Sequence, residues 1–392
     1  MIQKLLTITI LSLLIVSCGG EKKGTFDVMS TKNCTQEGRN QFVYDVLKDS
    51  YLWSDEVSDI NRSMLSLDDR TFLNQYLYNV KDVYSFIITK EQYNQHFVSG
   101  ESKDFGYRSV NYRDEYNVTR EIVKFVFPNS AADKAGIKRS DIILPRDAND
   151  TQLHIQDQNG LIRDISLKSE RYDVHNVLYQ KIFDLNRHKV GYFLFKSFVG
   201  PNLIKNLNET FATFKREGID ELIIDLRYNG GGLLHVAAHL GSLIGGENVK
   251  GHIFQYNRYN QKYSKYNDKT YFAPIPIESL HLKKVYFLTT GDTVSASESL
   301  INALKASENG IEVITIGMET EGKQFGMHTM HYCDKVLVPI QFSDSNSDGE
   351  GFIGGLKPTC KLQENFAHDF ADINEDLLSE ALYHIENGQC KR

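Results

Sequence analysis

The sequence predicts a multidomain protein of the α/β (α+β) class, on three observations. From residue 189 onward, β-rich runs alternate with segments of helical period, as in a sheet covered by helices. Asn40–Gly100 shows helical patterning, whereas Gln152–Lys168 predicts a β-hairpin with its turn at Gln158–Gly160. A chain of 392 residues, at about 150 residues per domain, has room for two or three domains.

The strands and helices of the predicted core follow one another closely. Alternating or continuous apolar residues predict strands at Lys189–Phe195, Glu221–Asp225, Lys284–Thr289 and Gly310–Ile316. Apolar residues at helical spacing predict helices at Leu203–Glu217, Leu233–Ile244, just after Ser295, and Asn374–Ile385. The predicted domain boundaries are a signal peptide at 1–17, a tether at 18–33, a helical N-terminal domain at 34–102, a β-rich domain at 103–183 and a core domain at 184–392.

The first residues predict export. Met1–Ser17 carries Lys4 and then an apolar run that is too short for a transmembrane helix and fits a secretory signal. Small residues beside Cys18 resemble a bacterial lipoprotein signal, which implies lipidation of Cys18 and membrane anchoring in the cell envelope. The alternative is an ordinary signal peptide with an incidental cysteine. Gly19–Asn33 is polar and glycine-containing, as in a flexible tether.

Charge and composition exclude several functions. The net charge of −7 and the absence of long basic runs argue against nucleic acid as a partner. We expect no cofactor and no metal: Asp344–Glu350 resembles only half of a calcium loop, and no carboxylate lies between His235 and His239 as in a zinc peptidase motif. No phosphate-binding motif is complete after the glycines at 230–232. The oligomeric state stays open.

Four cysteines follow Cys18, an even number in an exported chain, so disulfides are expected. Cys360 and Cys390 bracket the predicted C-terminal helix, and a bridge between them would hold that tail. Cys34 and Cys333 are the remaining pair.

The segment Thr293–Glu298 is the main candidate for chemistry. Small residues around Ser295 allow a sharp turn, and the helix that follows presents free N–H groups and a positive dipole end, which suit an oxyanion. No Gly-x-Ser-x-Gly elbow is present, but a lysine can serve as the base if its pKa falls from about 10.4 to roughly 7–8. Only a dry pocket lowers it so far, so we expect Glu319 and Glu321 to face away from the amine of Lys323.

Three blocks in this order, Asp225–Gly232, Thr293–Glu298 and Thr320–Lys323, resemble the signature segments of the carboxyl-terminal processing (tail-specific) serine peptidases. The resemblance implies a crotonase/Clp-like peptidase core with Ser295 as nucleophile and Lys323 as general base. Some relatives place a glutamine where this chain has Met327, so the group that orients Lys323 is open.

The same resemblance implies the surroundings of the nucleophile. The oxyanion hole would combine the N–H of Ala296 with that of Gly231 or Gly232, and Arg227 and Glu298 would support the site.

Phe105–Glu170 resembles a PDZ domain, on the segment Pro128–Leu144 and on Gly106 as the start of a carboxylate-binding loop. Ala131 and Ser140 replace the usual proline and glycine, and too few residues remain for the second PDZ helix. Peptide capture and a structural or gating role both stay open.

The implied function is a serine endopeptidase of the cell envelope that cleaves unfolded or tail-exposed proteins. One alternative is a catalytically weak or inactive protein of the same fold that binds peptides or apolar ligands. Another is an esterase that pairs Ser295 with a histidine. The tyrosine-rich Tyr256–Phe272 favours an ordinary hairpin over a substrate cleft.

Overall fold

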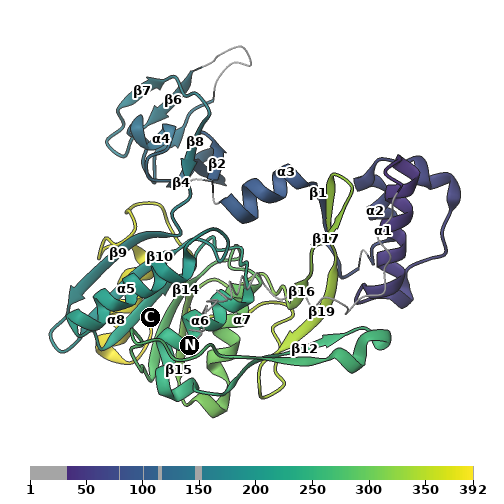
Figure 1. Ribbon diagram of the computed structural model, residues 1–392. Helices are drawn as coiled ribbons and strands as arrows, with labels where there is room; N and C mark the ends of the chain where they lie inside the picture. The colour runs from purple at the N-terminus through teal and green to yellow at the C-terminus, as the bar shows by residue number, and fades with distance from the viewer. Residues whose placement is uncertain (1–32, 79, 100, 114–116, 146–151, 392) are drawn as a thin grey trace, which may run out of the picture.

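The computed structural model describes residues 33–78, 80–99, 101–113, 117–145 and 152–391. The predicted signal peptide, Cys18 and nearly all of the predicted tether lie outside these residues. Within them, no helix is long and apolar enough to cross a membrane. Figure 1 shows a large α/β core, a small β-sheet module above it and the N-terminal helices to one side. The predicted α/β (α+β) class is confirmed.

A six-stranded sheet forms the centre of the core, in the order β20-β15-β14-β11-β10-β9. The edge strand β9 (Val177–Asp184) is antiparallel to β10 (Lys189–Phe195). The others run parallel to β10: β11 (Glu221–Asp225), β14 (Lys284–Thr289), β15 (Glu312–Gly317) and β20 (Cys360–Lys361). All four strands predicted from the sequence are therefore present.

Helices cover both faces of this sheet, because successive side chains of each strand point to opposite sides. On one side, Phe193 and Phe195 pack with α5 (Leu203–Glu217), α6 (Leu234–Gly245) and α7 (Ala296–Lys305). On the other, Tyr192 and Leu194 pack with α8 (Asp376–Asn387). The core is thus a three-layer sandwich, and the predicted helices are confirmed.

The parallel order brings three loops to one edge of the sheet. Strands β11, β14 and β15 are direct neighbours, with Asp225 opposite Leu288 and Thr289 opposite Gly317. Their carboxyl ends therefore meet, and this edge is where open α/β sheets hold their functional groups. The loops that leave it are the glycine loop (226–233), the serine turn (290–295) and the lysine loop (318–324).

A second, four-stranded sheet extends from the core in the order β13-β12-β19-β16. Its strands are β12 (Ile253–Tyr259), β13 (Asp268–Tyr271), β16 (Phe325–Met327) and β19 (Ile340–Ser345). The predicted tyrosine-rich hairpin is thus present, as β12 and β13. Tyr263 at the tip of the hairpin is buried, and its hydroxyl donates to the Asp49 carboxylate, in α1 (Gln36–Ser50), at 2.6 Å.

The N-terminal helices pack on a three-stranded sheet, two strands of which come from the later part of the chain. Strand β1 (Phe86–Thr89) pairs with β18 (Lys335–Val338), which pairs with β17 (Met330–Tyr332). Helices α1 (Gln36–Ser50) and α2 (Asp69–Tyr76) share one apolar core with these strands. A disulfide between Cys34 and Cys333 closes the assembly. The second bridge, Cys360 to Cys390, holds the end of α8.

The small β-sheet module is the five-stranded antiparallel sheet β3-β4-β5-β6-β7 with one short helix. Its strands are β3 (Tyr107–Arg113), β4 (Thr119–Val126), β5 (Ile142–Ile143), β6 (Leu153–Gln156) and β7 (Ile162–Ile165). The predicted hairpin is β6 with β7. In the part of residues 103–183 that the structure describes, α4 (Ala131–Lys134) is the only helix, so no second PDZ helix is seen there.

Short elements connect these parts. Strand β2 (Glu101–Asp104) pairs with β8 (Glu170–Asp173) at the base of the small β-sheet module, and α3 (Lys90–Tyr93) continues as a π-helical turn at Asn94–Ser99. Turns of 3-10 helix are found at Ser54–Glu56, Arg62–Ser66, Gly246–Val249, Gln261–Tyr266 and Ser307–Asn309. The domain boundaries given above stay predictions.

We expect the Cys34 to Cys333 bridge to hold the N-terminal helices on the core. The double variant Cys34→Ser/Cys333→Ser should lose about 2–5 kcal/mol of unfolding free energy, because the bridge closes a very long loop. The fluorescence of Trp53, the single tryptophan, reports unfolding of this segment in urea. The matched control is Cys360→Ser/Cys390→Ser, which should move the Trp53 midpoint less. Identical midpoints for the first variant and the wild type would contradict the expectation.

Candidate active site

The serine turn holds Ser295 in an unusual backbone conformation. Its φ of 59° and ψ of −116° lie in a region that non-glycine residues rarely adopt, at a cost of about 1–3 kcal/mol. Hydrogen bonds to the glycine loop offset this strain: the N–H of Val294 donates to the carbonyl of Asn229 at 3.0 Å, and the Thr293 hydroxyl to that of Leu226 at 2.9 Å. Ser295 therefore stands at the start of α7, as predicted.

The glycine loop lies directly against this turn. A Cβ on Gly231 would come within 2.7 Å of the Val294 carbonyl oxygen and 2.9 Å of the Ala296 nitrogen, so only glycine fits there. The N–H of Gly231 donates to the Asn229 side chain at 3.0 Å. The N–H groups of Ala296 and Gly232, by contrast, have no acceptor among the residues that the structure describes.

The buried carboxylate of Glu298 joins the serine turn to the lysine loop. Its Oε2 accepts the N–H of Ser295 at 2.8 Å and that of Lys323 at 3.0 Å. Its Oε1 accepts the Thr320 hydroxyl at 2.5 Å and the N–H of Gly322 at 2.6 Å. Burial raises the pKa of Glu298, and these four donors oppose that shift.

The amine of Lys323 lies in a mainly apolar setting. Its Nζ is 3.6 Å from the Met327 sulfur and 5.0 Å from the centroid of the Tyr84 ring. Burial lowers the pKa of Lys323, and the more distant charges of Asp82 and Glu298 oppose the shift. This is the direction that a lysine base requires.

Ser295 and Lys323 lie on adjoining loops, yet within the described part of the chain their side chains form no hydrogen bond with each other. The Glu321 carboxylate accepts the Tyr84 hydroxyl at 3.2 Å. Among the described residues, neither Glu319 nor Glu321 forms an ion pair with the amine of Lys323, in keeping with the expectation that both face away.

Comparison with known proteins identifies the core. The sequence model of Peptidase family S41 matches residues 189–362. The match covers less than half of the chain and shows that this segment is similar to that family. The predicted resemblance to carboxyl-terminal processing peptidases is therefore confirmed at the level of the family.

Two curated relatives match parts of the chain. A "Carboxyl-terminal-processing protease" of Picosynechococcus sp. is 28% identical over 270 residues, which are 62% of this chain and 60% of that protein. A "Probable CtpA-like serine protease" of Staphylococcus aureus is 27% identical over 186 residues, 42% of this chain and 35% of that protein. The match thus spans less than two thirds of the length of either relative.

Solved structures share the fold. A putative S41 protease from Bacteroides fragilis superposes with a TM-score of 0.75 at 23% identity, over 88% of this chain and 97% of that one. The photosystem II D1 C-terminal processing protease superposes with a TM-score of 0.53 at 14% identity, over 84% and 94%. The similarity therefore extends well beyond the matched S41 segment.

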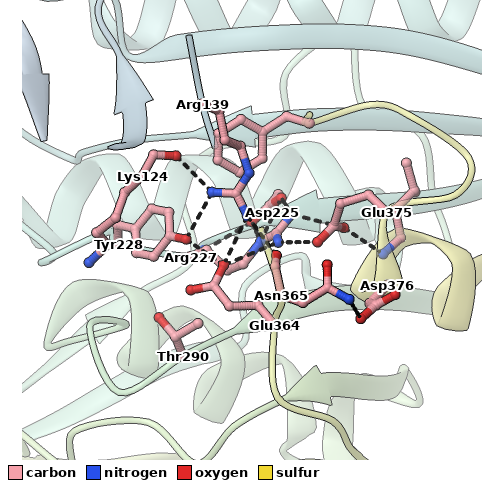
Figure 2. Close-up of polar contacts among 12 residues, drawn as sticks. Lys124, Arg139, Asp225, Arg227, Tyr228, Thr290, Glu364, Asn365, Glu375 and Asp376 are labelled. Atoms are coloured by element: carbon pink, nitrogen blue, oxygen red, sulfur yellow. Dashed lines mark hydrogen bonds and ion pairs between the residues drawn. The ribbon is translucent and has the colours of Figure 1, made fainter. Parts of the chain in front are cut away.

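Arg227 lies at the base of the glycine loop of the S41 domain, in the ion-pair network of Figure 2. Its guanidinium contacts Asp225 at 2.6 Å and Glu375, the N-cap of α8, also at 2.6 Å. All three side chains are buried. Arg227 thus fixes the loop to the opposite helix layer, and among the described residues its guanidinium forms no hydrogen bond or ion pair with Ser295 or Lys323.

The small β-sheet module reaches the same S41 loops, which the sequence did not predict. Arg139 donates to the Tyr228 hydroxyl at 3.2 Å and pairs with Glu364 at 3.2 Å (Figure 2). Lys124 pairs with Asp292, in the serine turn, at 2.5 Å. One module therefore touches both the glycine loop and the serine turn.

A second lysine with a shifted pKa lies at this boundary. Burial, with the charges of Arg108 and Lys124, lowers the pKa of Lys196 to about 8. Its amine donates to the carbonyl of Tyr228, in the glycine loop, at 2.6 Å. Lys196 therefore fixes the backbone of the glycine loop. No role for this lysine was predicted from the sequence.

Asp344 is a buried carboxyl group that few hydrogen-bond donors stabilise. It accepts the Ser299 hydroxyl at 2.8 Å, whereas its other oxygen has no partner among the described residues. Burial raises the pKa of Asp344 to about 7. Its ionisation is thus costly in the folded state.

We expect Glu298→Gln to destabilise the S41 domain by about 1–3 kcal/mol, because an amide cannot accept all four hydrogen bonds. Urea unfolding monitored by circular dichroism measures the change. Glu312→Gln is the matched control, since that carboxylate lies at the surface, where a substitution changes stability by less than about 0.5 kcal/mol. Equal losses of unfolding free energy in the two variants would contradict the role of Glu298 in joining the two loops.

Asp344 should make stability fall as pH rises. Its folded pKa of about 7 lies above its unfolded value near 3.9, so the unfolded state binds fewer protons between these values and stability declines through that window. Asp344→Asn should remove this decline and be more stable than the wild type at pH 8, by on the order of 3 kcal/mol. Thermal unfolding from pH 5 to pH 8 tests it, and parallel pH curves for the two proteins would refute it.

Proposed function

We propose that this protein is a serine endopeptidase of the cell envelope, with Ser295 as nucleophile and Lys323 as general base. The observation that carries the proposal is the shared Glu298 carboxylate. It binds the backbone N–H of Ser295 and of Lys323 in one S41 domain, and so fixes the two loops next to each other.

The chemistry follows from the groups at this edge. The neutral amine of Lys323 takes the proton of the Ser295 hydroxyl as Oγ adds to the scissile carbonyl carbon. The N–H groups of Ala296 and Gly232, which have no other acceptor among the described residues, bind the resulting oxyanion. The lysine then gives its proton to the leaving amine. Water attacks the acyl-enzyme in the second half, with Lys323 again as base.

Of the two glycines predicted for the oxyanion hole, Gly232 is the better donor. The Gly231 N–H is already bonded to the Asn229 side chain. Gly231 instead provides the close approach between the glycine loop and the serine turn, where a side chain would collide. We therefore assign Gly231 to the shape of the hole and Gly232 to binding.

The amine must rotate from Met327 toward Ser295 for the first proton transfer. Backbone hydrogen bonds fix both loops at Ser295 and Lys323, so we propose that a change of side-chain rotamer brings the amine to the hydroxyl. We propose that the Lys323 amine and the Ser295 hydroxyl come within hydrogen-bond distance when a substrate binds, because catalytic hydrogen bonds often shorten only in the substrate complex.

We propose that the chain is anchored through lipidated Cys18 and cleaves unfolded or tail-exposed proteins. For the small β-sheet module, the contacts of Lys124 with Asp292 and of Arg139 with Tyr228 favour a structural or gating role. Peptide capture is the alternative. The reduced helical content of the described module supports the first reading.

A second candidate function is a peptide-binding protein that does not turn over. The observation in its favour is that the amine of Lys323 contacts Met327 and Tyr84 rather than Ser295. Such a protein would bind peptides equally well after Ser295→Ala and would hydrolyse none in either form.

The test is casein cleavage by the purified, detergent-solubilised chain. Ser295→Ala and Lys323→Met should each lower the rate by about a thousandfold or more, because nucleophile and base act as a unit. Lys323→Arg should be as inactive, since arginine cannot lose its proton in a protein. The control is Ser264→Ala/Lys265→Ala, a pair of exposed residues on the tyrosine-rich hairpin. Wild-type turnover by Ser295→Ala would refute the proposal.

A further inference from the structure

A residue of the N-terminal segment lies over the candidate base. The Tyr84 ring is 5.0 Å from the Lys323 Nζ, and the Tyr84 hydroxyl donates to Glu321, two residues before Lys323, at 3.2 Å. Tyr84 thus contacts the amine with its face and the lysine loop with its edge. Tyr84 is not among the site residues predicted from the sequence.

Tyr84 is itself held in place. Its N–H donates to the carboxylate of Asp82 at 2.9 Å, and Asp82 is buried. The same carboxylate accepts the Tyr51 hydroxyl at 2.7 Å and the Ser85 hydroxyl at 2.5 Å. Ser85 in turn accepts the N–H of Ile340, in β19, at 3.0 Å. The ring is therefore fixed by a buried network that spans the N-terminal helices and the S41 domain.

The two ends of the Tyr84 side chain act on the amine in the same direction. The ring covers the amine, which keeps water away and preserves the burial that disfavours the ammonium form. The hydroxyl keeps the Glu321 carboxylate occupied, so that this negative charge does not turn toward the amine. The ring face also attracts a cation, which favours the ammonium form, so the burial that the ring provides has to exceed this attraction for the pKa of Lys323 to stay low.

We propose that Tyr84 is a positioning residue for Lys323: its ring shields the amine in a water-poor pocket, and its hydroxyl holds Glu321 aside. The inference rests on the proposed function, because it assigns the missing orienting group to that same base. It also gives the N-terminal segment a part in the chemistry beyond packing. The charged groups that act on the amine are Asp82 and Glu298, whereas Glu321 is bonded to the Tyr84 hydroxyl.

The pH dependence of kcat/KM for a fluorogenic peptide tests this role. Its rising limb reports loss of the proton from Lys323 in the free enzyme. Tyr84→Leu exposes the amine and frees Glu321, both of which favour the ammonium form, so the limb should move up by about one pH unit. Activity should then fall about tenfold on the acidic side and recover at alkaline pH.

Two further variants, Tyr84→Phe and Tyr84→Phe/Glu321→Gln, distinguish the effect of the ring from that of the hydroxyl. They also provide the test if Tyr84→Leu does not fold. The phenylalanine variant should move the limb up by a smaller amount, because only the restraint on Glu321 is lost. The double variant should return it to the wild-type position. Tyr44→Leu, a half-buried tyrosine of α1 whose hydroxyl donates to Ser58, is the matched control and should leave the limb in place.

The outcomes distinguish the inference from the proposed function. If Ser295→Ala is inactive while folded Tyr84 variants keep the wild-type limb, Tyr84 is a packing residue and only this inference fails. If Ser295→Ala keeps its activity, the proposed function fails first. An upward shift in Tyr84→Leu with no shift in Tyr44→Leu supports the positioning role.

Discussion

The buried carboxylate of Glu298 is the contact on which the site depends. Four donors from two loops converge on it: the N–H groups of Ser295, Gly322 and Lys323 and the hydroxyl of Thr320. An ionised carboxylate without such partners would be very costly inside a protein, so carboxylate and loops stabilise each other. The backbones of Ser295 and Lys323, the proposed nucleophile and base, are thus fixed together.

Much of the core was predictable because its signals are local. The periods of apolar residues in β10, β11, β14 and α5 gave the elements to within a residue or two. The three family blocks each follow one of three neighbouring parallel strands, so the rule for carboxyl ends explains why they meet. The even number of cysteines predicted disulfides, and Cys360 is bonded to Cys390, which bracket α8, while the remaining pair is Cys34 and Cys333.

The contacts around the amine were not predictable, because they join distant parts of the chain. Tyr84 and Glu321 are 237 residues apart, and Lys124 and Asp292 are 168 apart. No sequence periodicity links such pairs, and a single tyrosine or lysine in the sequence does not indicate whether its side chain is exposed or buried. Glu375, which is 148 residues from Arg227, was hidden as its partner for the same reason.

The N-terminal segment and the last third of the S41 domain are interleaved. Strand β1 pairs with β18, placing Phe86 opposite Val338, and the bridge from Cys34 to Cys333 spans 299 residues of sequence. Contacts of such high sequence separation form late in folding. During synthesis, the surroundings of Lys323 therefore cannot assemble until residue 338 is available, so a shorter growing chain carries an amine whose apolar surroundings are still incomplete.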